Sequence, residues 1–426
     1  MAAAASSDLR DIDDEISAID AQIQELSRRK RELVSARKRL RQREEEKECE
    51  RLQSKSWDGR EHAWSASLDE CLRSTFGLDD YRPLQLSVMN ASLSGHDVVV
   101  IMPTGGGKSL CYQLPALAAL PGGGGLTLVV SPLVSLMEDQ VMAMERVRPG
   151  AAKLFNANTS KEEGAAIIAA MMDKKSALKL LYVTPEKLAK SKRFMSKLQA
   201  SYKAGIFTRL AIDEVHCCSQ WGHDFRPDYK FLGVMKSLFP AVPVLGLTAT
   251  SSAQVTADCQ KILSLERCLQ FKAPFNRPNL FYEVRAKPDS GEECVAALVE
   301  MLNTEFSGST GIIYSLTIKD VETLAQQLND AGLRVAPYHG NLESATRSKV
   351  HQQWTGGQLQ AVVATIAFGM GIDKPDVRFV IHHTVSKSME NFYQETGRAG
   401  RDNLPARCAE SLQGHHLCPK DQDHFL

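Results

Sequence analysis

The sequence has no long apolar run and no dense group of cysteines. Its apolar stretch around residues 114–130 is interrupted by Pro115, Pro121 and four glycines, so it cannot supply the roughly 18 apolar residues of a membrane-spanning helix. Residues 1–10 are small and polar and lack the apolar core of a secretory signal. The 10 cysteines are scattered along 426 residues. This distribution differs from a secreted disulfide scaffold and favours a reducing compartment.

An excess of charge of one sign is also missing. The chain has 51 basic and 51 acidic side chains, so the net charge gives no argument for a polyanionic partner, and any nucleic-acid site must be argued from local features. At about 150 residues per domain, the length suggests roughly three units.

The first of these units is a predicted helix with a heptad pattern. Alternating spacings of three and four connect ten seam positions, of which eight are apolar: Leu9, Ile12, Ile16, Ile19, Ile23, Leu26, Lys30, Leu33, Arg37 and Leu40. This pattern predicts a coiled coil, with a helix packed on the body of the protein as the alternative. Residues 8–25 carry seven acids and one base, and residues 28–43 carry nine bases and one acid. The segregation favours antiparallel or staggered pairing, and the basic block is either a nuclear address or a charged coil face.

From Trp57 onward, apolar β-branched runs alternate with segments of helical length. The expected strands are 97–102, 126–131, 178–184, 210–212 and 242–248, and then 311–315, 333–338, 361–365 and 377–382. Such alternation predicts parallel sheets covered by helices on both faces. We therefore expect an α/β protein with two lobes that join near residue 280.

The strongest motif is a glycine-rich loop directly after the run Val98–Ile101. It reads Met102-Pro103-Thr104-Gly105-Gly106-Gly107-Lys108-Ser109. Consecutive glycines let backbone N–H groups surround phosphates, Lys108 reaches the β and γ phosphates, and Ser109 ligates Mg²⁺. Met102 stands where the strict pattern has its first glycine. The strand before the loop and the acids downstream nevertheless favour a nucleotide site over an ordinary glycine-rich turn.

The acidic motif is Asp213-Glu214-Val215-His216, which follows an apolar run. An acid at the carboxyl end of a parallel strand lies beside such a loop and holds Mg²⁺, and a second acid orients or deprotonates the attacking water. We expect Ser109 and Asp213 to hold Mg²⁺, partly through water, although acid pairs are also common on surfaces. The hydroxyls of residues 248–250 either link the ATP site to lobe movement or simply end a strand.

Taken in order, these motifs resemble those of a superfamily-2 helicase. The series comprises 81–85, 102–109, 131–133, 184–186, 213–216, 248–250, 364–375 and 394–401. With the stretch 220–229 the chain resembles a RecQ DNA helicase over about residues 57–405, and its N-terminal coil is similar to that of small metazoan members. The resemblance implies a coiled-coil helix (1–55), two RecA-like lobes (57–280 and 281–408) and a divergent tail (409–426).

The resemblance also implies roles for particular residues. Gln85, with Arg82 nearby, matches the family's adenine-recognition motif, and a Gln amide can bond adenine N6 and N7 together. Gln394, Arg398 and Arg401 match the arginine-finger motif, in which guanidinium groups from the second lobe stabilise the γ-phosphoryl charge. Gly371 and Asp373 are expected to face the nucleotide across the cleft.

A DNA contact is expected in the segment 219–229. Its candidate residues are Trp221, His223, Phe225 and Arg226, because aromatic faces stack on bases and arginine pairs with phosphate. The alternative is that Trp221 and Phe225 pack between the lobes. Lys187, Arg277 and Lys387 are weaker phosphate candidates.

The tail departs from the family pattern. After Arg401-Asp402 the family continues into a last strand, a four-cysteine zinc module and a winged helix, whereas residues 409–416 do not look like a strand. We expect no zinc here, since Cys408, His415, His416 and Cys418 match no trusted spacing. An alternative splice product or an incomplete gene model is the hypothesis for this tail.

The functional expectation is an ATP-dependent, nuclear DNA helicase that moves 3′ to 5′ in DNA repair, recombination or replication. Its expected ligands are ATP, Mg²⁺ and single-stranded or forked DNA, with a homo-oligomer or coiled-coil partner and no membrane. The alternatives are a truncated isoform that acts as a DNA- and ATP-binding interaction protein, and an RNA helicase of the same superfamily.

Overall fold

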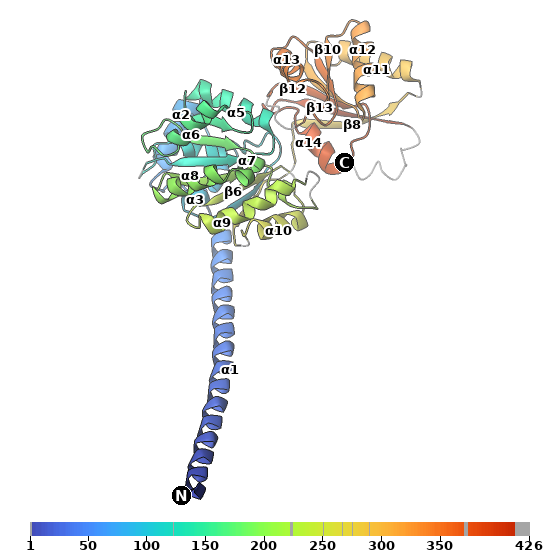
Figure 1. Ribbon diagram of the computed structural model, residues 1–426. Coiled ribbons are helices and arrows are strands. Elements are labelled where there is room, and N and C mark those ends of the chain that lie inside the picture. The colour runs from blue at the N-terminus through green and yellow to red at the C-terminus, as the bar shows by residue number, and fades with distance from the viewer. Residues whose placement is uncertain are drawn as a thin grey trace. The chain divides into compact units, whose positions relative to one another are not determined.

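The computed structural model describes residues 2–121, 123–221, 225–249, 251–265, 267–274, 276–288, 290–369 and 374–413. The chain divides into two compact units, residues 1–55 and 56–426, and Figure 1 shows the elements of each. In the described part of the chain no helix is both long enough and apolar enough to cross a membrane.

The first unit is one continuous helix, α1, which spans Ala2–Ser54. At about 1.5 Å per residue its 53 residues are roughly 80 Å long. Apolar side chains of the seam are exposed to solvent: Ile16 is 52% exposed, Ile23 54% and Leu26 68%. The predicted helix is therefore confirmed, and its exposed apolar seam is consistent with a coiled coil.

The second unit contains two all-parallel sheets. The first has the order β3-β4-β2-β5-β6-β1-β7. Its strands are β1 (Val98–Ile101), β2 (Leu126–Val130), β3 (Ala152–Phe155), β4 (Leu180–Val183), β5 (Phe207–Ile212), β6 (Val244–Thr248) and β7 (Leu269–Lys272). Its helices are α2 (Ser65–Phe76), α3 (Gln85–Leu93), α4 (Leu110–Leu117), α5 (Val134–Val147), α6 (Lys161–Ala170), α7 (Pro185–Lys190), α8 (Lys192–Lys203), α9 (Gly233–Leu238) and α10 (Ala253–Ile262), with 3₁₀ turns η1 (Val215–Cys218) and η2 (Pro227–Leu232).

The second sheet has the order β10-β11-β9-β12-β13-β8. Its strands are β8 (Leu280–Lys287), β9 (Thr310–Tyr314), β10 (Val335–Tyr338), β11 (Ala361–Ala364), β12 (Val377–His382) and β13 (Ala406–Gln413). Its helices are α11 (Gly291–Asn303), α12 (Ile318–Asp330), α13 (Ser344–Thr355) and α14 (Met389–Thr396).

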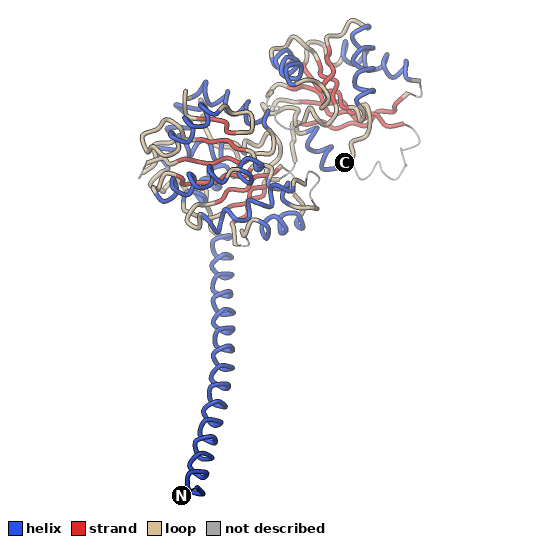
Figure 2. Tube along the Cα trace, in the orientation of Figure 1, coloured by secondary structure: helices blue, strands red, loops and turns tan. Residues whose placement is uncertain are grey.

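Two hydrophobic clusters show that helices cover both faces of this second sheet. Ile313 packs in one cluster with residues of α11 and α12. Its neighbour Ile312 packs in the other cluster with Trp354 of α13. Successive residues of a strand point to opposite faces, so the sheet is a buried layer between helices, as Figure 2 also shows. The expected α/β class with two parallel-sheet lobes is confirmed.

All nine strands expected from the sequence are present, but four further strands were missed. β3, β7 and β8 lie at sheet edges. An edge strand has a neighbouring strand on one side only and is more exposed to solvent, so it does not need a continuous apolar run. β8, for example, alternates between exposed and partly buried residues over most of its length.

The expectation that residues 409–416 form no strand is wrong for residues 409–413. β13 continues to Gln413 and pairs in parallel with β12 on one side and with β8 on the other. Its sequence, ARCAESLQ, has no β-branched residue, but backbone hydrogen bonding to two neighbours overrides this weak local preference. The second sheet therefore includes a final strand that was not expected from the sequence, and this sheet extends beyond residue 408.

Candidate functional site

The glycine-rich loop connects β1 to α4 at the carboxyl edge of the first sheet. Gly105 and Gly107 have φ values of +80° and +82°, a region that only glycine adopts readily. A Cβ at Gly107 would collide with the amide nitrogen of Gln85. Lys108 Nζ donates to the Met102 and Pro103 carbonyls at 3.1 and 3.4 Å, and burial lowers the pKa of its ammonium group. The loop thus surrounds the partly buried ammonium group of Lys108.

Arg82 and Gln85 are attached directly to this loop. The amide of Gln85 accepts from the backbone N–H of Arg82 at 2.8 Å and donates to the carbonyl of Gly107 at 3.0 Å. The guanidinium of Arg82 donates to the carbonyl of Gly105. These bonds place both expected adenine-binding residues at the mouth of the glycine-rich loop.

The two acids follow β5 at the same edge of the sheet. Asp213 N–H donates to the Val130 carbonyl at 2.8 Å, and Glu214 N–H donates to Asp213 Oδ1 at 3.0 Å. Burial, reinforced by the neighbouring Glu214 carboxylate, raises the pKa of Asp213 to about 7, while Lys108 favours the charged form. Glu214 has a left-handed backbone with φ 49° and ψ 48°, which is a strained conformation typical of functional sites.

Two neighbours of the acids had no role predicted from the sequence, although His216 was part of the acidic motif. His216 Nδ1 lies 2.8 Å from Thr248 Oγ1 and 3.4 Å from Glu214 Oε2, so it connects the acidic motif to the end of β6. Tyr229 is fully buried and its hydroxyl donates to the Asp213 carbonyl at 2.9 Å. Tyr229 lay within a segment assigned to DNA contact, and only the tertiary structure shows that it supports the acid.

The second lobe contributes α14 and the loop that follows it. Arg398 is 3% exposed and its Nε has no hydrogen-bond partner in the described part of the chain. The Arg401 side chain packs over Gly105, where an added Cβ would lie 3.0 Å from Arg401 Cγ. Glu395 anchors α14 by accepting from Ser386 Oγ at 2.6 Å and contacting His382 Nε2 at 2.9 Å. This buried anchor was also missed.

A cleft of about 400 Å³ collects most of these side chains. The expected site residues that line it are Arg82, Gln85, Thr104, Gly105, Gly107, Lys108, Ser109, Asp213, Glu214, Gln394, Arg398 and Arg401. Met102, Pro103 and Gly106 belong to the same loop without lining the cleft. Residues more than 300 positions apart in the chain therefore line the same cleft.

Among the described residues of the expected DNA-contact segment, one aromatic side chain is exposed to solvent. Trp221 is 70% exposed, so it does not pack between the lobes. Phe225 is half-buried, with the Lys230 ammonium 5.2 Å from its ring centroid. Arg226 donates to the Pro132 carbonyl at 2.9 Å, which ties the segment to the 131–133 motif.

Three other phosphate candidates lie in different settings. The Lys187 ammonium is 4.2 Å from the Phe155 ring centroid, and Lys387 is exposed. Arg277 donates to backbone carbonyls of both lobes. Several further candidates lie outside the described residues, namely His223, Thr250, Gly371, Asp373, His415, His416 and Cys418.

Comparisons with known proteins agree with this arrangement. The family model described as DEAD/DEAH box helicase matches residues 82–258, and the model described as Helicase conserved C-terminal domain matches residues 293–403. The ATP-dependent DNA helicase Q1 of Rattus norvegicus is 50% identical over 414 residues, which cover 95% of this chain and 66% of the relative. The protein of the same name from Pongo abelii is 53% identical over 83% of this chain and 54% of its own length. The chain thus spans less than two thirds of these relatives.

A solved structure shows the same fold at lower identity. The Mycobacterium smegmatis helicase Lhr bound to ssDNA and AMP-PNP superposes with a TM-score of 0.64 at 22% identity, over 82% of this chain and 48% of that one. Together, the order of the motifs, the two helicase models and the relatives at about 50% identity show that the chain belongs to the RecQ family of superfamily-2 helicases.

Proposed function

We propose that this chain is a DNA-stimulated ATPase that moves 3′ to 5′ along single-stranded DNA and separates duplexes, in the nucleus and in DNA repair, recombination or replication. The observation that carries the proposal is the shared cleft, in which Lys108 and Glu214 of the first lobe meet Arg398 and Arg401 of the second. The names of the relatives at about 50% identity point to the same activity.

The donor set suits a magnesium nucleotide. Gly107 lets the loop pass so close to the Gln85 amide that a Cβ there would collide with it, and Lys108 supplies a cation beneath the loop. The Ser109 hydroxyl and the Asp213 carboxylate are the hard oxygen ligands that Mg²⁺ prefers. When bound, Mg²⁺ would neutralise charge on the β and γ phosphates. Arg82 and Gln85 would hold the adenine beside the loop.

The remaining side chains have separate tasks in hydrolysis. Glu214 would orient and deprotonate the attacking water. Arg398 and Arg401 would neutralise the charge that spreads over the γ-phosphoryl oxygens, an effect worth about 10³ to 10⁵ in rate in related NTPases. Gln394 lines the cleft on the same side. Because these groups come from two lobes, hydrolysis would depend on how closely the lobes approach.

The DNA partner is proposed from the exposed aromatic side chain. Trp221, at 70% exposure, is available to stack on a base of any identity. Its backbone N–H donates to Ser219 Oγ at 3.2 Å, and Ser219 Oγ in turn donates to Asp258 Oδ2 at 2.6 Å. These two bonds connect Trp221, through Ser219, to Asp258 on α10.

A forked-duplex unwinding assay with wild type and Lys108→Ala tests the proposal. We expect ATP-dependent unwinding by wild type only, and ATPase stimulation by DNA rather than RNA. If neither protein unwinds DNA or hydrolyses ATP while both still bind DNA and co-purify with a partner through residues 1–55, the chain is instead an interaction protein. Stimulation by RNA alone would indicate an RNA helicase.

A second proposal concerns the partner of α1. We infer that α1 pairs antiparallel with α1 of a second copy, because its apolar seam is exposed and its charges are segregated. Layers of a and d residues face each other in an antiparallel pair, which sets Ile16 opposite Leu33 and Ile23 opposite Leu26. Residues 15–25, with three acids and no base, then face residues 24–34, with four bases and two acids. Parallel pairing would instead set Glu15 against Asp20.

Cysteine cross-linking of the full chain distinguishes these orientations. With Cys49→Ser as background, a mixture of Ile16→Cys and Leu33→Cys chains should form a disulfide dimer, and either variant alone should not. In an antiparallel pair of Ile16→Cys chains, the two introduced thiols would be about 25 Å apart along the helix axis. Cross-linking of Ile16→Cys with itself would show a parallel pair, and a monomer in sedimentation would refute self-association.

A further inference from the structure

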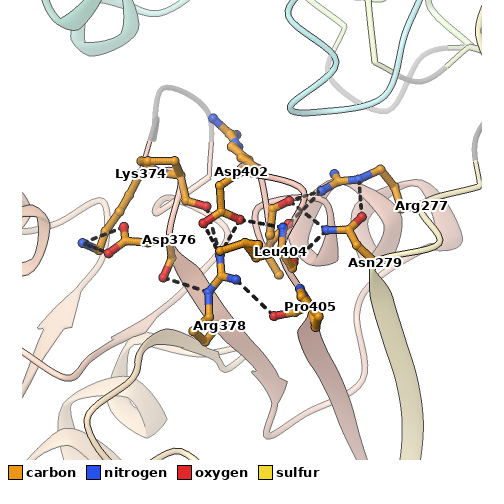
Figure 3. Close-up of polar contacts among 12 residues, drawn as sticks. Arg277, Asn279, Lys374, Asp376, Arg378, Asp402, Leu404 and Pro405 are labelled. Carbon is orange, nitrogen blue, oxygen red and sulfur yellow. Dashed lines mark hydrogen bonds and ion pairs between the residues drawn. The ribbon is translucent and has the colours of Figure 1, made fainter. Parts of the chain in front are cut away.

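Arg277 lies in the segment between β7 and β8 and contacts both lobes. Its Nη1 donates to the carbonyl of Thr104, in the glycine-rich loop, at 3.0 Å. The same guanidinium donates to the carbonyls of Gly397, Ala399 and Gly400 at 3.4, 3.0 and 2.7 Å. Residues 397–401, here called the finger loop, carry Arg398 and Arg401. Figure 3 shows Arg277 and Asn279 beside this loop.

These contacts use every N–H of the side chain. Arginine has five donors in a planar fork, and the fifth, Nε, donates to Asn279 Oδ1 at 3.3 Å. No carboxylate of the described residues forms an ion pair with Arg277. A half-buried guanidinium that is satisfied by four carbonyls is committed to backbone positions, so it is not available as a phosphate ligand in this arrangement.

The two loops also touch at the point that Arg277 bridges. A Cβ at Gly397 would lie 3.1 Å from Thr104 Cβ, so the end of α14 packs closely on the glycine-rich loop. A shift of Thr104 on nucleotide binding would move the carbonyl that accepts from Arg277 Nη1. Arg277 Nη2 meanwhile remains bonded to the carbonyls of Ala399 and Gly400. The planar fork is rigid, so it would transmit such a shift to the finger loop.

We propose that Arg277 is a positioning residue that couples the glycine-rich loop to the finger loop, so that nucleotide binding at the first lobe sets the placement of Arg398 and Arg401. This inference rests on the proposed ATPase function. It adds a third element, the segment between the lobes, to the two that line the cleft.

Arg277→Lys tests the coupling because it keeps the charge but replaces the planar fork by one nitrogen, which cannot span four carbonyls. We expect kcat of the DNA-stimulated ATPase to fall about 10- to 100-fold, the range for a small misplacement of reacting groups, with KM for ATP changed less than about 3-fold. Arg277→Lys added to the double variant Arg398→Ala/Arg401→Ala should cost little more than the double variant alone, because Arg277 acts through these two groups.

Arg378→Lys is the matched control. Arg378 holds the residue after the finger loop through two bonds to Asp402 at 2.6 and 2.7 Å (Figure 3). Among the described residues, its other hydrogen bonds go to Pro375, Asp376 and Pro405 and not to the glycine-rich loop. We expect this variant to retain kcat within about 3-fold. An equal loss in both variants would show that loop rigidity, not the bridge, matters, and full activity of Arg277→Lys would also overturn the proposal.

Hydrogen exchange provides a readout that does not require hydrolysis. Addition of ADP should change the exchange of amides 397–404 in wild type and Arg378→Lys but not in Arg277→Lys. If wild type binds ADP without this change, the coupling is refuted even if the ATPase is active. If wild type shows the change but lacks ATPase activity, the proposed function fails while the coupling stands. A wild type that does not bind ADP refutes both.

Discussion

Replacing Asp213 with asparagine should raise the free energy of unfolding of the ligand-free protein at neutral pH. The same substitution should have a smaller effect on stability in acid. Asp213 is buried beside Glu214, and these surroundings raise its pKa from 3.8 to about 7 in the folded protein. Between these values the unfolded chain has released its proton while the folded chain keeps it. The unfolded state then binds fewer protons, so the free energy of unfolding decreases as the pH rises through this window.

The size of the effect follows from the shift. Each pKa unit corresponds to about 1.36 kcal/mol. The interval between pH 5 and the folded pKa of Asp213 near 7 is about two pH units. The stability gained by Asp213→Asn should therefore be about 2 to 3 kcal/mol larger at pH 8 than at pH 5. For a lobe of this size this corresponds to roughly 5 to 10 °C in Tm.

Thermal unfolding of wild type and Asp213→Asn at pH 5, 6, 7 and 8, without nucleotide or Mg²⁺, measures this difference. The exposed Asp330→Asn on α12 is the control and should show no pH-dependent gap from wild type. A gap for Asp213→Asn that is the same at every pH, or that grows toward pH 5, would refute the assignment of a raised pKa. Mg²⁺ with ADP should stabilise wild type more than Asp213→Asn at pH 8, because the variant lacks the charged ligand.

Two further substitutions test the supports of the site. Gly107→Ala should weaken nucleotide binding at least 10-fold, since its Cβ would occupy the position of the Gln85 amide. The control Gly77→Ala, also at positive φ but with nothing within 4 Å of the added Cβ, should leave nucleotide binding unchanged. Equal nucleotide binding by both variants would contradict the argument. Tyr229→Phe should lower the free energy of unfolding by about 1 to 2 kcal/mol, because the buried Asp213 carbonyl loses its hydrogen-bond donor. Tyr202→Phe should lower it less, because the Tyr202 hydroxyl accepts a longer bond, of 3.4 Å, from the Ala241 N–H. Chemical denaturation of the two variants and wild type measures these differences.

Local sequence patterns predicted the interior of the fold well. Strands β1, β2, β4 and β6 are mostly apolar, because both faces of a parallel sheet are covered, and every residue in them is buried. The glycine-rich loop and the acids after β5 could be located for a related reason, since the carboxyl ends of parallel strands meet at one edge of the sheet.

The edges of the sheets and β13 were harder to predict. Edge strands such as β7 carry polar side chains that local periodicity does not separate from a loop. β13 is held by backbone bonds to β12 and β8, and backbone bonding leaves no mark on side-chain composition.

The sequence by itself determined the chemistry of this protein: the heptad seam of α1, the parallel α/β lobes and the identity of the groups that line the cleft. The seam and the lobes depend on residue type and local spacing, whereas the cleft residues 82, 85, 394, 398 and 401 were assigned through the resemblance to the family. The tertiary structure alone decided which groups meet: His216 with Thr248, Tyr229 with the Asp213 carbonyl, and Arg277 with both loops. These contacts join distant positions, several of them through backbone atoms that every residue possesses, so only the folded chain reveals them.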